Sequence, residues 1–147
     1  LEYTDHGPRL GFQLDLESIK KLKPWSEAIH EMEFQKKAMQ ITRSRLSQDK
    51  GLIGFVGGPW TLFVYAVEGS HTGSLTTTKK LLFDLWPLFV NMMTPFLIEN
   101  IKMQFEGGAD VVMIFDTAAG ELSPVLYDQL VIPELKKISD AYPNKLG

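Results

Sequence analysis

The sequence has no cysteine and no dense cluster of basic residues. The missing cysteines exclude disulfides, thiolate metal ligands and a cysteine nucleophile. They also fit a reducing compartment, so we expect a cytoplasmic protein. The formal net charge is −3. Because nucleic acids are bound through concentrated basic faces, this charge balance argues against a nucleic-acid partner.

Long uninterrupted apolar runs are also lacking. Runs such as residues 85–89 and 111–115 are far shorter than the roughly 20 residues that span a bilayer. Residues 1–13 have no signal-peptide pattern. We therefore expect no membrane association. With 44% hydrophobic and 22% charged residues over 147 positions, the composition is that of a globular protein of about one domain.

The first third of the chain predicts mainly helices. We expect a hairpin or irregular arm over residues 1–12, a short helix over 15–22, and a long helix over 26–48 with Ser26 as its N-cap. Residues 51–56 form a short apolar run that ends at two glycines and a proline, which is typical of a buried strand feeding a tight loop.

The remainder alternates between helices and a second strand. We expect a helix over 60–67 stopped by Gly69, a loop over 70–73, and a helix from Ser74 that Pro87 divides from another over 88–105. Residues 109–115 predict a second buried strand. Ser123 and Pro124 then start a helix, and Pro133 opens a segment that ends near residue 141. A further strand is due where the chain stops.

Two apolar strands joined by helices form a βαβ unit, so the sheet should be parallel. Two core strands alone would leave long apolar edges exposed. A closed barrel needs eight such units and typically about 250 residues. We therefore predict an α/β fold that is part of a (β/α)8 TIM barrel, with about two core parallel strands and several flanking helices. Residues 1–147 would be the middle portion of one larger barrel domain.

Chemistry in parallel α/β folds is found beyond the carboxyl ends of the strands. The first such loop contains Gly57 and Gly58, which allow a close backbone approach to a ligand or a positive φ. Tyr65 follows on the next helix, where its phenol could donate a hydrogen bond to a substrate carboxylate. The alternative is that Trp60, Phe63 and Tyr65 are all core aromatics.

The second loop begins with Asp116 and Thr117 at the end of the second strand. Polar side chains at a barrel strand end favour a functional role. The alternatives are a cap for Asp116 and a local hydroxyl-to-backbone bond for Thr117. A metal site is poorly supported, because the three histidines, at positions 6, 30 and 71, are scattered. Glu68, near His71, is interpreted as exposed loop polarity.

Residues 54–69 read Gly-Phe-Val-Gly-Gly-Pro-Trp-Thr-Leu-Phe-Val-Tyr-Ala-Val-Glu-Gly. This segment resembles the uroporphyrinogen decarboxylase family, which has Gly-Phe-x-Gly-x-Pro-Trp-Thr-Leu followed by Tyr-x-Val-Glu-Gly. Further similarity lies in residues 7–8, 42–46, 107–110 and 115–117, so the resemblance covers nearly all of the chain in order.

The resemblance implies a cofactor-free carboxy-lyase of haem biosynthesis, a homodimer when complete. Its reaction removes the four acetate carboxyls of uroporphyrinogen III to give coproporphyrinogen III. It also implies that Tyr65 and Thr117 bind the substrate. The family's arginine loop, its catalytic aspartate and its histidine near the C-terminus have no counterpart here, and Asp5 does not match that aspartate. We therefore expect no catalytic residue in this chain, and no activity from it alone.

Two other functions remain open. A corrinoid or methylthiol methyltransferase of the same superfamily shares the barrel but holds zinc with histidine and cysteine. The missing cysteines weigh only mildly against it, since those ligands would lie downstream of Gly147. A non-catalytic helical interaction module is suggested by long amphipathic helices and six methionines. Circular dichroism together with a porphyrinogen turnover assay on the full-length protein would separate these functions.

Overall fold

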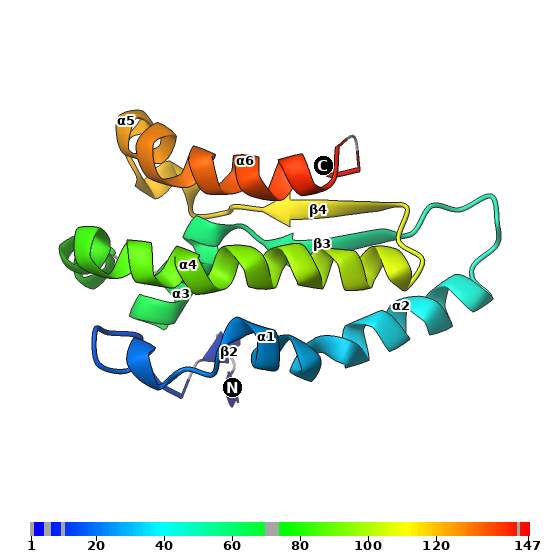
Figure 1. Cartoon of the computed structure of the whole chain (residues 1–147), viewed down its shortest axis with the longest axis horizontal. Helices are drawn as coiled ribbons and strands as arrows, with labels where there is room; N and C mark the ends of the chain where they lie inside the picture. The colour runs from blue at the N-terminus through cyan, green and yellow to red at the C-terminus, as the bar shows by residue number, and fades with distance from the viewer. Residues whose placement is uncertain (1, 5–6, 10, 70–73, 144) are drawn as a thin grey trace.

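The computed structural model describes residues 2–4, 7–9, 11–69, 74–143 and 145–147 (Figure 1). The helices and strands are, in chain order, β1 Glu2–Thr4, β2 Gly7–Arg9, α1 Trp25–Ala28, α2 Glu33–Arg45, β3 Ile53–Gly57, α3 Pro59–Glu68, α4 Thr76–Glu106, β4 Val111–Phe115, α5 Pro124–Leu126 and α6 Ile132–Ala141. Short 3-10 turns occupy Ile19–Lys21, Ile29–Met32 and Ala119–Glu121, and a π-helical turn occupies Tyr127–Val131.

Strands β3 and β4 are parallel neighbours, which confirms the predicted βαβ unit. Ile53 lies opposite Val111, and Gly57 lies opposite Phe115. On the other edge of β4, Leu146 forms a parallel bridge with Val112. The backbone N–H of Gly147 donates to the Val112 carbonyl at 3.1 Å. Residues 145–147 thus pair with β4 in parallel, at the position where the sequence predicts the next strand.

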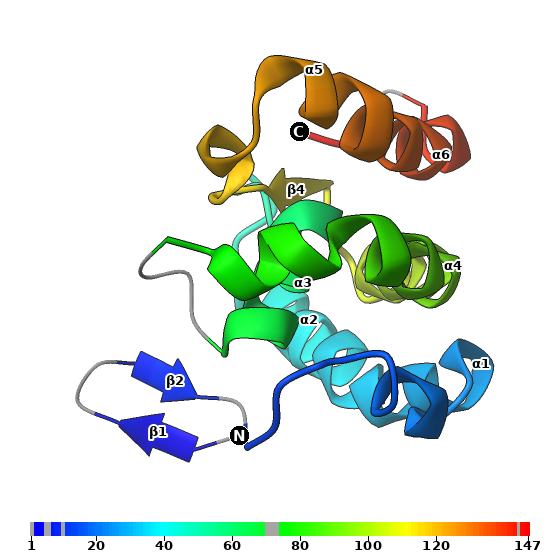
Figure 2. The ribbon, with the colours of Figure 1, turned by 90° about the vertical axis from the view of Figure 1, so that its left-hand side faces the viewer.

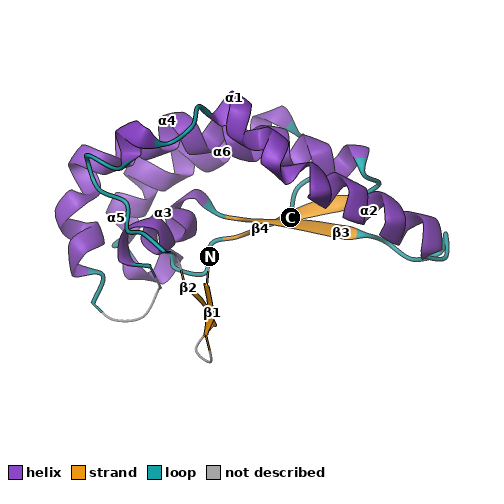
Figure 3. Ribbon diagram, turned by 90° about the horizontal axis from the view of Figure 1, so that it is seen from below, coloured by secondary structure: helices purple, strands orange, loops and turns teal. Residues whose placement is uncertain are grey.

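The long helices cover one face of this strand pair and leave the other face open (Figure 3). Figure 2 shows α4 between α6 on one side and α1 with α2 on the other. Burial along β3 alternates, with Gly54 and Val56 buried and Phe55 68% exposed. The prediction of a buried strand therefore holds for the covered face of β3 and is wrong for the open face. In a closed barrel that face points inward, because alternate residues of each strand face the interior.

Two apolar clusters hold the described elements together, one between helices α3 and α4 and one between the helices and the strands. In the first, the rings of Trp60 and Phe63 in α3 pack against those of Trp86 and Phe89 in α4, and the Phe63 and Trp86 centroids are 5.3 Å apart. The second joins Val56 and Val112 of the strands to Ile101 of α4 and Ile138 of α6. Fully burying a side chain of this size contributes about 1.5–3 kcal/mol.

Helix α4 is continuous, so the predicted division at Pro87 is wrong. A proline inside a helix removes the hydrogen bond to the carbonyl four residues earlier. For Pro87 and Pro95 those carbonyls belong to Phe83 and Asn91, which both lie on the exposed side of α4. Water can satisfy the two freed carbonyls there, and the buried side of α4 holds the helix together through its packing.

By length and composition alone, α4 could cross a membrane. The sequence-based expectation missed this helix because it counted uninterrupted apolar runs and divided the segment at Pro87. The buried side chains of α4 pack against α3, α6 and both strands, as those of a core helix do.

The predicted helix over residues 26–48 is divided into α1, a 3-10 turn and α2, and it ends at Arg45. Ser26 is not its N-cap. Helix α1 already begins at Trp25, because the Pro24 carbonyl accepts the backbone N–H groups of Glu27 and Ala28, both at 3.0 Å. The short helix expected over 15–22 is reduced to the turn Ile19–Lys21.

At the N-terminus, β1 and β2 form the expected antiparallel hairpin, with Thr4 opposite Gly7. Pro133 lies at the start of α6, as predicted, but the π-helical turn joins α5 to α6 without a break. Asp5, His6 and the predicted loop over residues 70–73, which contains His71, lie outside the described residues.

Candidate functional site

The loops that follow β3 and β4 lie at the same rim of the strand pair. Both strand arrows in Figure 1 point toward the end where α3 and α5 lie. The two loops are also joined, because the backbone N–H of Gly58 donates to the Phe115 carbonyl at 2.7 Å. This arrangement confirms that the segments carrying Tyr65 and Thr117 are neighbours at the carboxyl ends of parallel strands.

Asp116 caps helix α3 from the second loop. Its Oδ1 atom accepts hydrogen bonds from the Thr61 backbone N–H at 2.8 Å and from the Thr61 hydroxyl at 2.6 Å. A carboxylate at a helix N-terminus is favoured by the unpaired N–H groups and the helix dipole. Between a functional role and a cap, the structure therefore supports the cap for Asp116. The helix that Asp116 caps is α3 rather than the helix that follows it.

Gly58 makes this cap possible. A Cβ atom at position 58 would lie 2.7 Å from the Asp116 Cβ, so any larger residue would push the second loop away. The φ of Gly58 is −66°, an ordinary value. The glycine is therefore explained by the close approach of the Asp116 side chain, and the positive φ that the sequence also allowed does not occur here.

Thr117 lies between two anchored residues. On one side is Asp116, and on the other is Ala118, which is 2% exposed. The Ala118 N–H donates to the Thr61 hydroxyl at 3.0 Å, and the Ala118 carbonyl accepts from the Trp60 indole at 2.8 Å. The Thr117 side chain is exposed at this rim, and the described residues show no hydroxyl-to-backbone bond for it.

Tyr65 lies in α3 and is half-buried, whereas Trp60 and Phe63 are fully buried core aromatics. The core alternative is thus correct for Trp60 and Phe63, and for the half-buried Tyr65 it stays open. That Tyr65 and Thr117 face one common hollow stays a prediction.

The rest of the Tyr-x-Val-Glu-Gly segment has structural roles. Val67 is 1% exposed in the core, and Gly69 ends α3 with a φ of 77°. The Glu68 carboxylate accepts the Thr78 backbone N–H at 2.8 Å and so caps α4. The interpretation of Glu68 as loop polarity is therefore wrong. The helix expected from Ser74 begins two residues later, at Thr76.

Tyr127, in the π-helical turn, completes the contacts of Asp116. Its hydroxyl donates to Asp116 Oδ2 at 2.7 Å. Burial, and next the hydrogen bond to Asp116, raise the pKa of the Tyr127 phenol above its ordinary value of 10.0. The phenol therefore stays protonated, and a hydrogen-bond donor, at neutral pH.

This raised pKa predicts a stability loss in alkali that depends on Tyr127. In the unfolded chain a tyrosine ionises near pH 10, whereas folding holds the proton, so stability is complete below about pH 10 and is lost as the pH rises beyond it. We expect the free energy of unfolding of the full-length protein, measured with urea, to fall less steeply above about pH 10 in Tyr127→Phe than in wild type. Tyr142 also has a raised pKa, so some fall remains. Identical slopes for the two proteins would contradict the prediction.

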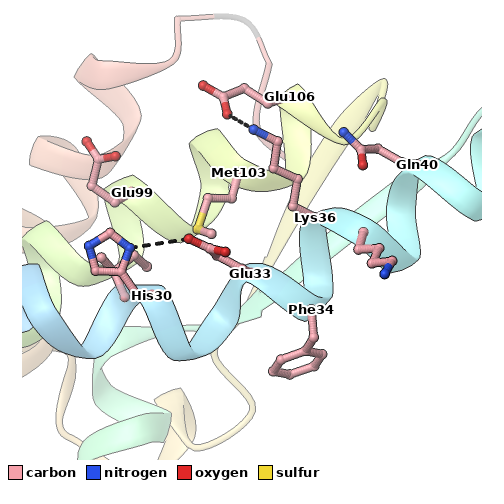
Figure 4. Close-up of a pocket in the computed structure, with 10 residues that line it drawn as sticks. His30, Glu33, Phe34, Lys36, Gln40, Glu99, Met103 and Glu106 are labelled. Carbon is pink, nitrogen blue, oxygen red and sulfur yellow. Dashed lines mark hydrogen bonds and ion pairs between the residues drawn. The ribbon is translucent and has the colours of Figure 1, made fainter.

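A groove of about 640 Å³ lies elsewhere, on the helical side of the molecule between α2 and α4 (Figure 4). Within it, Lys36 of α2 forms an ion pair with Glu106 of α4, and His30 contacts Glu33 at 3.3 Å. Its walls include neither Tyr65 nor Thr117. These four side chains contact each other in pairs and so do not converge on a bound molecule, as the polar groups of a ligand site do.

The described part of the chain brings together no group of three or more histidine, aspartate or glutamate side chains that could hold a metal ion.

The sequence singled out Asp116 and Thr117 from their place at a strand end. It missed Thr61 and Tyr127, because nothing in their spacing shows that both contact Asp116. A polar Thr61 two residues after the helix-starting Pro59 was the only signal available.

Comparison with known proteins identifies the family of the chain. The family model described as uroporphyrinogen decarboxylase (URO-D) matches residues 2–147. Curated proteins named uroporphyrinogen decarboxylase are 34% identical in Prochlorococcus marinus over 85% of the chain, 33% in Synechococcus over 91%, and 36% in Helicobacter pylori over 85%. The matched regions cover 36%, 39% and 37% of these relatives, so the chain spans well under half of their length.

The match runs through β3, α3, α4 and β4 and includes both rim loops. The chain therefore belongs to the uroporphyrinogen decarboxylase family, and its parallel strands and flanking helices are part of that family's (β/α)8 barrel.

Proposed function

We propose that residues 1–147 are the central part of one barrel domain of a uroporphyrinogen decarboxylase. The whole protein would be a carboxy-lyase that converts uroporphyrinogen III to coproporphyrinogen III. The observation that carries this proposal is the joined pair of rim loops. The segment 54–69 and the Asp116–Thr117 turn, which both match the family, lie together at the carboxyl ends of β3 and β4.

In each of its four steps the reaction replaces an acetate carboxylate with a proton. Protonation of a pyrrole carbon makes the ring an electron sink, and the bond to the carboxylate breaks to release carbon dioxide. A proton then adds to the resulting exocyclic methylene to complete the methyl group, and the ring carbon gives up the proton that it had gained. A buried carboxylate stabilises the cationic intermediate. That carboxylate, like the arginines that would bind the substrate's acid groups, would come from segments outside these 147 residues.

Tyr65 and Thr117 bind the substrate in this proposal. Each carries a hydroxyl that can donate a hydrogen bond to a carboxylate, and each follows the carboxyl end of its strand. Their role is to orient the macrocycle, because neither group can supply the required charge. No organic cofactor or metal takes part. The complete protein would be a cytoplasmic homodimer whose substrate is a small molecule.

The proposal is tested by incubating the full-length protein with uroporphyrinogen III under anaerobic conditions and separating the products by chromatography. We expect coproporphyrinogen III, with intermediates that have lost one to three carboxyls. The isolated 147-residue chain should form none. Folded full-length protein that yields no coproporphyrinogen would end the proposal.

Tyr65→Phe in the full-length protein should lower kcat/KM by roughly 10-fold to 100-fold, because a hydrogen bond to a charged group contributes about 1.5–3 kcal/mol. The fold should keep its stability, since only a hydroxyl is removed from a half-buried side chain. Steady-state kinetics and a urea titration check both expectations. Unchanged kinetics would remove Tyr65 from the site.

A further inference from the structure

The backbone at Thr117 is held on both sides by helix α3. Asp116 binds Thr61 through two hydrogen bonds, and Ala118 binds Thr61 and Trp60 through one each. Thr117 is thus the middle residue of a three-residue segment, and both residues that flank it are hydrogen-bonded to α3. Because α3 also carries Tyr65, the same contacts fix the positions of both proposed substrate-binding residues relative to each other.

Both contacts to Thr61 use the Asp116 Oδ1 atom, which leaves Oδ2 to be held by another group. Tyr127 holds it, through the 2.7 Å hydrogen bond from its hydroxyl. Carboxylate groups rotate readily when only one oxygen is bound, so the second contact fixes the plane of the group. The Tyr127 side chain is half-buried, which limits competition from water for this bond.

Tyr127 lies in an irregular turn of the helical segment that follows β4. The turn Tyr127–Val131 is π-helical, and such turns inside helices occur frequently at functional sites. The wider turn lies between the Ser123 cap of α5 and Pro133 in the first turn of α6. Any change in this turn moves the phenol relative to Asp116, which couples the helix after β4 to the rim.

We infer that Tyr127 is a positioning residue for the site, acting through Asp116 to fix Thr117 against α3. This inference rests on the proposed function, because it assumes that Thr117 contacts substrate. Tyr127 itself need not touch the substrate. Its loss should leave Thr117 present but free to adopt several positions, which lowers the fraction of protein that is ready to bind.

The kinetic test uses Tyr127→Phe and Thr117→Ala, alone and combined, in the full-length protein. We expect Tyr127→Phe to lower kcat/KM roughly tenfold and to change the same parameter, KM or kcat, as Thr117→Ala. The double variant should be no worse than Thr117→Ala alone, because Tyr127 acts through Thr117. Losses that multiply in the double variant would overturn the inference.

Tyr142→Phe is the matched control. It also removes a half-buried phenol that donates to an oxygen, here the Ile98 carbonyl at 2.6 Å, and Tyr142 directly follows α6 at its far end from the rim. We expect Tyr142→Phe to reduce stability about as much as Tyr127→Phe while leaving kcat/KM within about twofold. Equal kinetic losses in the two variants would show that Tyr127 acts only on stability and would overturn the inference.

Hydrogen exchange gives a measurement that does not depend on the substrate. Amide exchange in peptides covering residues 116–122 should accelerate at least severalfold in Tyr127→Phe and stay unchanged in Tyr142→Phe. If wild-type protein does not decarboxylate uroporphyrinogen while this exchange difference is seen, the proposed function fails and the positioning of the loop stands. If wild type is active and the exchange is unchanged in both variants, the positioning role fails alone.

Discussion

Asp116→Ala is expected to cost the full-length protein roughly 3 kcal/mol of stability and more than about 100-fold in kcat/KM. The substitution leaves three donors without their acceptor: the Thr61 N–H, the Thr61 hydroxyl and the Tyr127 hydroxyl. Each unsatisfied buried group costs about 1–3 kcal/mol, and the three costs are less than additive because water can enter the space. The kinetic loss follows because Thr117 is then joined to α3 on one side only, through Ala118.

Asp116→Asn separates the shape of this side chain from its charge. The amide oxygen can still accept from Thr61, and the Tyr127 hydroxyl can rotate to accept from the amide nitrogen. We expect a loss of about 1 kcal/mol, which reflects the weaker interaction of a neutral cap with the helix N-terminus. Asp128→Ala, an exposed aspartate on the same π-helical turn, serves as the control and should be close to neutral.

Urea unfolding and steady-state kinetics measure these effects together. Equal stability for Asp116→Ala and Asp128→Ala would contradict the role of Asp116 as the hydrogen-bond acceptor for Thr61 and Tyr127. Full activity in a destabilised Asp116→Ala protein would show that these hydrogen bonds do not affect the substrate site.

Local patterns in the sequence predict the strand pair and α3 well. The apolar runs 51–56 and 109–115 each contain most of a strand, and Gly69 does end α3, because a positive φ is most readily adopted by glycine. The Ser123 cap is confirmed by its 3.3 Å hydrogen bond from the Leu126 N–H. These features depend on neighbours within a few residues, which is why the sequence shows them.

Contacts between distant segments are what the sequence could not show. Pro87 predicts a break only if the packing of α4 is ignored, and the aromatic cluster around Trp86 keeps the helix intact. Glu68 and Asp116 cap helices that lie elsewhere in the fold, so neither follows the local capping pattern. Site residues that act through such contacts, Thr61 and Tyr127, are therefore invisible until the chain is folded.

Gly54→Ala should be among the most destabilising small substitutions in the strand pair. A Cβ atom at this position would lie 2.3 Å from the Gln104 Oε1 atom, with Met39 and Val112 atoms at 3.1 and 3.2 Å. The Gln104 amide pairs with both backbone groups of Phe55, accepting from its N–H at 2.9 Å and donating to its carbonyl at 3.0 Å. In this way a side chain of helix α4 satisfies the backbone hydrogen-bonding groups of Phe55 on the edge of β3 away from β4.

Moving Gln104 disturbs a chain of buried amides. Its Nε2 atom also donates to Asn100 Oδ1 at 2.8 Å, and Asn100 in turn donates to Gln35 of α2 at 2.8 Å. Gln104 and Asn100 are only 4% and 3% exposed, so water cannot readily replace the lost partners. We therefore expect Gly54→Ala to cost roughly 2–4 kcal/mol in the full-length protein.

The matched control is Gly51→Ala, three residues earlier, where the nearest atom to an added Cβ is 3.8 Å away. That substitution should be neutral or stabilising by up to about 1 kcal/mol, since alanine reduces the freedom of the unfolded chain. A double-mutant cycle with Gln104→Ala then identifies the cause. If the added methyl acts by displacing Gln104, Gly54→Ala should cost at least about 1 kcal/mol less once Gln104 is absent. Additive losses would show instead that the clash is with Met39 and Val112.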